Sequence, residues 1–112
     1  MRPIFVTVAG ANTTSSVIPT NTYANPFNVG FGVSVVSGSV NYTIQHTFDD
    51  VWSSTFNPST ATWFNHPTIA AQTAAADGNY AFPVTGIRLV GNAGNTGTAK
   101  LSLVQAGGSA RG

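Results

Sequence analysis

Two stretches of strict alternation between apolar and polar or small residues constrain this chain more than any other feature. Residues 29–35 read VGFGVSV, and residues 40–48 read VNYTIQHTF. Successive side chains of a β-strand point to opposite faces, so a period of two is typical of strands buried on one face. The short Ser37-Gly38-Ser39 segment between the two runs predicts that they form an antiparallel hairpin.

Further strands are predicted by the same reasoning over residues 4–8, 17–18, 79–82, 84–90 and 98–105. The Gly- and Asn-rich segment 91–97 predicts a second hairpin, between the last two of these strands. Gly30 and Gly32 weaken the outer face of their strand, which suggests either a bulge or the close approach of another backbone. Residues 69–76 are ambiguous, and we expect an extended segment there rather than a helical turn.

The choice of residues supports an all-β fold. Val, Ile, Thr, Phe, Tyr and Trp number 44, whereas Leu, Met, Gln, Lys, Arg and Glu number 11. Branched and aromatic side chains suit a pleated sheet, and straight-chain ones suit helices. Seven or eight short strands in one domain, residues 1–112, predict an antiparallel β-sandwich with extended terminal segments. A jelly-roll is preferred, because the Cys-Trp-Cys signature of the alternative, an immunoglobulin-like sandwich, is absent.

Charged residues are unusually few. They make up 6% of the chain, with a formal net charge of +1, against about 25% in an ordinary soluble domain. Interfaces are depleted in charge because its desolvation is costly, so this composition suits a subunit covered by neighbours. The alternative is an exported protein with a coat of Ser, Thr and Asn. Four basic residues spread along the chain make no patch for nucleic acid, and no apolar run is long enough to span a membrane.

Residues able to carry chemistry are also scarce. His46 and His66 are the only histidines, and they sit in no recognised catalytic motif. We interpret His46, on the inward phase of its strand, as a structural histidine. Asp49 and Asp50 are adjacent, so on an extended chain they would point apart, and a role in capping a loop is expected. The sequence therefore predicts a protein that is not an enzyme and has no catalytic residues, metal site or cofactor.

The connection over residues 49–67 is long and rich in aromatic residues. Loops of this length are uncommon in compact domains unless they have a function. We expect Trp63 and Phe64 to cover the open end of the sandwich or to contact another subunit. The alternative is that aromatic residues stack on sugar rings, the candidates being Trp52, Trp63, Phe64, Tyr80 and Phe82.

Several stretches resemble those of small virion structural proteins of tailed bacteriophages. They are VNYTIQHTFDD at 40–50, DGNY at 77–80, TGIRL at 85–89 and KLSLVQAG at 100–107. The likeness covers residues 27–107 and is to jelly-roll capsid cement or decoration proteins in particular. It implies a homodimer or homotrimer made in the bacterial host cytoplasm. On the exterior of the virion capsid, this oligomer would bind the major capsid protein and stabilise contacts between its subunits.

Residues expected at the interface come from both termini and from the aromatic connection. They are Arg2, Pro3, Ile4, Phe5, Trp52, Trp63, Phe64 and Arg111. The alternative function is a tail- or capsid-associated host-recognition module, in which the loop from Trp52 to Phe64 binds a surface glycan.

Overall fold

The computed structural model describes residues 4–20 and 28–105. This part of the chain contains no helix, and so none that could cross a membrane. Its strands are β1 (Ile4–Ala9), β2 (Thr13–Thr14), β3 (Ile18–Pro19), β4 (Val29–Ser37), β5 (Tyr42–Thr47), β6 (Trp63–Asn65), β7 (Ala76–Tyr80), β8 (Gly86–Gly91) and β9 (Thr98–Gln105). The all-β prediction is confirmed.

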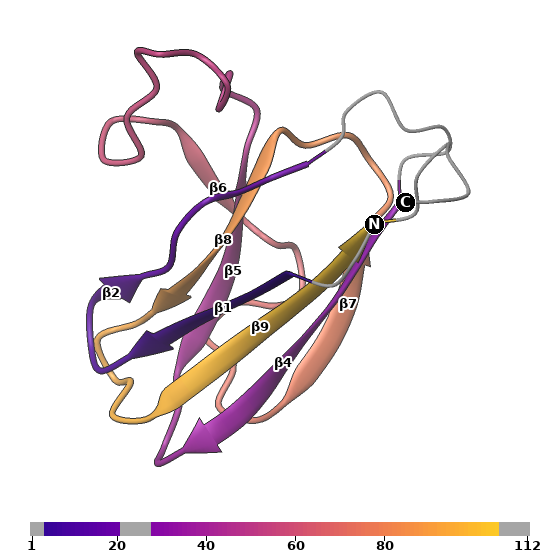
Figure 1. Ribbon diagram of the computed structural model, residues 1–112. Coiled ribbons are helices and arrows are strands. Elements are labelled where there is room, and N and C mark those ends of the chain that lie inside the picture. The colour runs from indigo at the N-terminus through magenta and orange to yellow at the C-terminus, as the bar shows by residue number, and fades with distance from the viewer. Residues whose placement is uncertain (1–3, 21–27, 106–112) are drawn as a thin grey trace.

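The strands form two antiparallel sheets packed face to face (Figure 1). The first sheet has the order β1-β9-β4-β7. The second has the order β2-β8-β5-β6, and β3 also pairs with β8. Alternate residues of β4, β5, β8 and β9 point inward, and the largest fully buried side chains include Tyr42, Tyr80, Ile44, Ile87 and Leu101.

The pairing is nested, which makes the sandwich a jelly-roll. The first strand pairs with the last, β2 and β3 pair with β8, β4 pairs with β7, and β5 pairs with β6. A long hairpin rolled into two layers produces this order. The immunoglobulin-like alternative requires a different order of strands and is excluded.

Both predicted hairpins are wrong, although their strands exist. β4 pairs with β7 and β9, whereas β5 pairs with β6 and β8, so residues 38–41 cross between the sheets. Residues 92–97 likewise cross from β8 in one sheet to β9 in the other. A short glycine-containing connection suits either a hairpin or a crossing at the end of a sandwich, and alternation along the strands is the same in both.

The sequence also missed two short strands. β2 lies in a segment expected to be a loop, and β6 lies inside the long aromatic connection. In addition, β7 spans Ala76–Tyr80, whereas the strand was expected over residues 79–82. Val17–Ile18 was expected as an edge strand, and Ile18–Pro19 of β3 fills that role beside β8.

A buried asparagine joins three connections at one end of the sandwich. Asn95 is 1% exposed. Its Oδ1 accepts a hydrogen bond from the backbone N–H of Asn41 at 3.0 Å, and its Nδ2 donates to the carbonyls of Gly10 and Gly97 at 2.8 and 3.1 Å. We call Asn95 and these three partners the asparagine clasp. It satisfies the backbone N–H of Asn41 and adds a further hydrogen bond to the carbonyls of Gly10 and Gly97, which also accept from Thr13 Oγ1 and from the Gly10 N–H.

Close backbone approach occurs beside the clasp and not at the glycines that suggested it. A Cβ on Gly97 would lie 2.3 Å from the carbonyl oxygen of Ser37. By contrast, a Cβ on Gly30 or Gly32 would meet nothing nearer than 3.9 Å, and the irregularity of β4 falls later, between Val35 and Ser37. The interpretation of Gly30 and Gly32 as a bulge or as a close approach within the chain is therefore wrong.

Candidate functional site

Three exposed phenylalanines gather at the opposite end of β5 from the asparagine clasp. Phe48 follows β5, Phe64 lies in β6 and Phe82 follows β7; they are 54%, 48% and 41% exposed. The ring centroids of Phe48 lie 5.8 Å from Phe64 and 6.5 Å from Phe82. We call these three residues, with His46 beneath them, the aromatic patch. It lies where the edge strands β6 and β7 leave the sandwich open.

His46 connects the patch to the core. Its ring is 5% exposed and lies 5.4, 5.9 and 5.5 Å from the rings of Phe48, Phe64 and Phe82. The Phe64 ring stacks on it with an interplanar angle of 25°. Phe64 lies opposite His46 in the β5–β6 pairing, so both side chains are on the inward phase of their strands. Phe64 thus covers the open side of the sandwich, as expected.

Tyr80 fixes the protonation state of His46. Its hydroxyl lies 2.9 Å from His46 Nδ1, and burial raises the pKa of the Tyr80 phenol, which therefore keeps its proton. In the described part of the chain this proton has no other acceptor, so we assign Tyr80 as donor and Nδ1 as acceptor. The hydrogen of neutral His46 then resides on Nε2. Burial, and secondarily His66, lowers the pKa of His46, which favours this neutral form.

Both ring nitrogens of His66 have hydrogen-bond partners within the chain. Its Nε2 lies 3.1 Å from the carbonyl of Asn79, to which it donates. Its Nδ1 accepts from the backbone N–H groups of Thr68 and Ile69 at 3.2 and 3.1 Å. These bonds tie the segment after β6 to β7 and are structural. His66 also contacts Tyr80, so the two histidines flank one phenol ring.

His46 differs from His66 because its second nitrogen is open. Within residues 4–20 and 28–105, Nε2 of His46 has no hydrogen-bond partner. Every fully buried side-chain nitrogen or oxygen of those residues has one, so Nε2 retains some exposure to solvent. The site therefore consists of three phenylalanine rings and the one N–H donor of the imidazole that they contact. His46 was expected to be structural and inward-facing, and its bond to Tyr80 confirms this, but its open donor was not foreseen.

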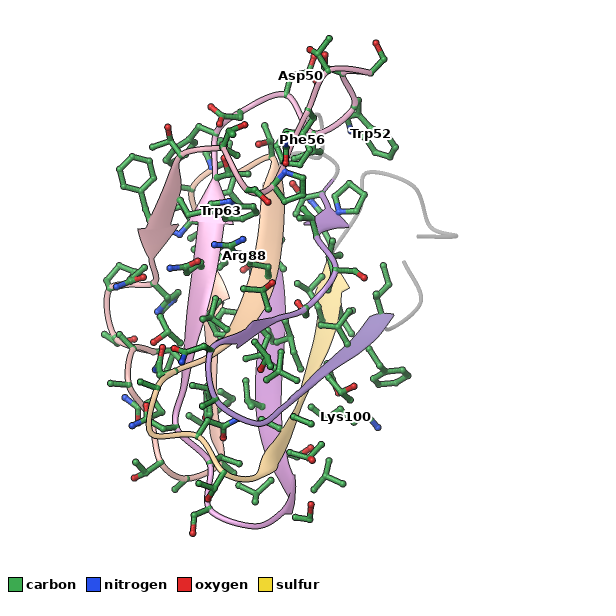
Figure 2. The ribbon with its side chains drawn as sticks, turned by 90° about the vertical axis from the view of Figure 1, so that its left-hand side faces the viewer. Asp50, Trp52, Phe56, Trp63, Arg88 and Lys100 are labelled. Carbon is green, nitrogen blue, oxygen red and sulfur yellow. The ribbon has the colours of Figure 1, made fainter. Side chains whose placement is uncertain are left out.

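Trp63 lies on the outer face of its sheet and does not cover the open end as expected. It pairs with Thr47, one residue out of phase with Phe64. Its indole Nε1 donates to the carbonyl of Pro58 at 2.9 Å, and the Arg88 guanidinium lies 4.0 Å above its ring (Figure 2). Arg88 also donates to Gln45 Oε1 through Nε and Nη2. Trp63 is thus engaged within the chain.

Trp52 lies on the loop between β5 and β6, at the top of Figure 2, and is 75% exposed. Asp50 Oδ1 accepts from the backbone N–H of Trp52 at 3.1 Å, and Asp49 Oδ2 accepts from that of Thr62 at 2.9 Å. The expected loop-capping role of both aspartates is confirmed. A shallow hollow of about 260 Å³ beside them is lined by residues of the same loop.

The remaining expected interface residues lie at the termini. Phe5, in β1, is 56% exposed, and the ammonium of Lys100 lies 4.4 Å above its ring. Ile4 is half-buried and packs against the core, so its side chain is not a free surface. Arg2, Pro3 and Arg111 lie outside the described residues. Phe5 lies in β1, at the opposite edge of the first sheet from β7, so it is separate from the patch and the expected residues do not form one surface.

No group of three or more His, Asp or Glu side chains comes together in the described ranges in a way that could hold a metal ion. The donors nearest the patch are the two histidines, and His66 is occupied by backbone groups. The chemistry available at the patch is apolar contact and one hydrogen bond.

Comparison with known proteins gives one informative likeness. No protein-family model matches the chain, and no curated protein matches it. A solved structure described as "Bacillus endospore appendages form a novel family of disulfide-linked pili" superposes with a TM-score of 0.51 and 15% identity. The alignment covers 96% of this chain and 87% of that one. At this identity the likeness concerns the fold alone, and it supports a β-sandwich.

Proposed function

We propose that this chain is a structural subunit of a multi-copy protein assembly, and specifically a capsid cement protein of a tailed bacteriophage. In this role it would associate with itself and bind the major capsid protein on the outer shell. The observation that carries the proposal is the aromatic patch. Phe48, Phe64 and Phe82 are roughly half exposed in a compact group, a feature that marks a surface for protein contact.

The scarcity of charge supports the same role. Only 6% of the residues are charged, so little desolvation opposes the burial of large parts of the exterior. A modest apolar contact is weak alone, yet many copies on one shell bind together with high avidity. A cement protein needs this combination, since it adds many small contacts between subunits that are already assembled.

The likeness to the endospore appendage is compatible with an assembling subunit, because that protein is described as one of a family of pili. The disulfide linkage of those pili has no counterpart here, since this chain has no cysteine. Any assembly it forms would therefore not be linked through disulfides of this chain.

The test is the number of copies per particle in virions purified from the host that encodes the chain. The cement proposal predicts copies comparable in number to the major capsid protein, together with rebinding of the purified chain to stripped shells. A handful of copies, or no rebinding, would contradict it.

A second candidate, a glycan-binding host-recognition module, is favoured by one observation. Trp52 is 75% exposed on a loop that projects from the sandwich. This alternative predicts few copies per particle and saccharide binding that is lost in Trp52→Ala. The same measurement of copy number therefore separates the two candidates.

A further inference from the structure

We infer that the aromatic patch is a docking site for an apolar peptide segment of another protein, whose backbone carbonyl accepts a hydrogen bond from His46 Nε2. The inference rests on one part of the proposed function, namely that another protein covers the aromatic patch. It names the chemistry of the partner, and it can be tested on the isolated chain.

The open donor determines what can cover the patch. Nε2 belongs to the imidazole that lies among Phe48, Phe64 and Phe82, whose ring centroids are all within 6 Å of its own. An occupant that excludes water from these rings must also supply an acceptor, because a buried donor without a partner is costly. A peptide segment meets both needs, since each apolar side chain is accompanied by a carbonyl. A lipid tail supplies apolar contact and no acceptor.

Two other occupants fit less well. If the patch paired with the same patch of a second copy, two Nε2–H donors would meet, and neither would find an acceptor. A sugar ring would bring several hydroxyl groups against three phenylalanines that offer no hydrogen bond. The carboxylates nearest in sequence, Asp49 and Asp50, already accept hydrogen bonds within their own loop. We therefore assign the site to a peptide segment.

The experiment follows the His46 side chain by nitrogen-15 NMR while N-acetyl-L-leucine N-methylamide is added to the purified chain. This probe carries one aliphatic side chain between two carbonyl acceptors. We expect a saturable shift of the Nε2 resonance with a dissociation constant in the millimolar range, as befits so small a ligand. The thioamide analogue, whose sulfur is a poorer acceptor, should bind more weakly.

Exposed variants supply matched controls that leave the core intact. Phe48→Ser and Phe82→Ser should each weaken probe binding roughly fivefold or more, since each removes one wall of aromatic contact. Phe5→Ser removes an equally exposed ring from β1, at the far edge of the first sheet from β7, and should leave binding unchanged. His46→Asn keeps an acceptor for Tyr80 but removes Nε2, and it should reduce the preference for the amide over the thioamide; its backbone spectrum reports whether it folds.

Three outcomes would overturn the inference. One is an equal shift with methyl β-D-glucopyranoside, which would indicate a glycan site. Another is a shift on concentrating the chain without the probe, which would indicate pairing of two copies. The third is probe binding that is absent or that Phe48→Ser and Phe82→Ser do not change. Any of these can occur while the copy number per virion still supports the cement proposal, and probe binding can succeed while that proposal fails.

Discussion

The polar side chains at the two ends of β5 differ in how fully they are hydrogen-bonded. At the start of β5, the asparagine clasp gives Asn95 three backbone partners from three different connections. At its end, His46 has one hydrogen-bond partner among the residues that the structure describes, Tyr80, and its ring, with Nε2 unpaired there, is surrounded by three exposed rings. The first end is satisfied by hydrogen bonds within the chain, and the second presents exposed aromatic rings around a buried imidazole. The contrast indicates which end of the sandwich meets other molecules.

The contrast predicts that substitutions at the clasp cost folding stability and substitutions at the patch cost association. The largest expected effect is that of Asn95→Leu, which is nearly isosteric. It removes three hydrogen bonds and leaves the backbone N–H of Asn41 without its partner, whereas the carbonyls of Gly10 and Gly97 still accept from Thr13 Oγ1 and from the Gly10 N–H. We expect a loss of about 4 kcal/mol in the free energy of unfolding, measured with urea. Asn92→Ala, which removes only bonds to two side chains, should cost about 1 kcal/mol.

The backbone contact beside the clasp gives the next largest effect. Gly97→Ala would place a Cβ 2.3 Å from the Ser37 carbonyl oxygen, so the two crossings must move apart. We expect a loss of about 3 kcal/mol in the same urea measurement. Gly30→Ala is the matched control, because its Cβ would have room, and it should leave stability unchanged or raise it by about 0.5 kcal/mol. Equal effects of the two substitutions would contradict this description of the clasp.

Beneath the patch, Tyr80→Phe should have a moderate effect. It removes the hydroxyl that donates to His46 Nδ1 and leaves that nitrogen unpaired in a buried ring. We expect a loss of about 1.5 kcal/mol in the free energy of unfolding. The tautomer of His46 should also lose its preference, which nitrogen-15 NMR of the imidazole would detect. An unchanged tautomer would show that Tyr80 does not set it.

The same bond predicts a dependence of stability on pH. The pKa of His46 is lower in the folded chain than in the unfolded chain. As pH falls below about 6.5, the unfolded chain therefore binds a proton at His46 before the folded chain does. Stability should therefore be full near neutral pH and decline as the solution is acidified through that value. The groups facing His46 are Tyr80 and His66, and His46→Asn should flatten the decline. A His46 titration midpoint at or above the ordinary value would contradict this.

The smallest effect on folding is expected at the rim of the patch. Phe48→Ser alters a ring that is 54% exposed, and it should change the free energy of unfolding by no more than about 0.5 kcal/mol. Its effect should appear in rebinding to stripped shells, which we expect to weaken while urea unfolding stays the same. A large loss of stability would place Phe48 in the core and remove the contrast between the two ends.

Much of the fold could be predicted from the sequence because alternation reports burial directly. Thr98–Gln105 was predicted with its observed bounds, and the inward phases of β4 and β5 were assigned correctly as far as Val33 and His46. The partners of the strands were not predictable in this way. A crossing between sheets and a hairpin use the same turn residues, and the feature that separates them here is the contact of Gly38 with Gly97 across the fold.

The candidate site was only partly predictable for a similar reason. Phe64 was expected at the open end, but Phe48 and Phe82 belong to different segments and join it only through the pairing of edge strands. β6 has three residues, too few for alternation to show that Trp63 points outward. The open nitrogen of His46 depends on where Tyr80 lies, and local sequence carries no signal of that contact.

The most direct test of the patch as an interaction surface is hydroxyl-radical footprinting of Phe48, Phe64 and Phe82 in the free chain and in the native assembly. The rings are roughly half exposed in the free chain and should all be labelled there. If a partner covers the patch, labelling of all three should fall severalfold in the assembly and return on disassembly. Equal labelling in both states would mean that the patch stays bare, which would contradict its role in assembly.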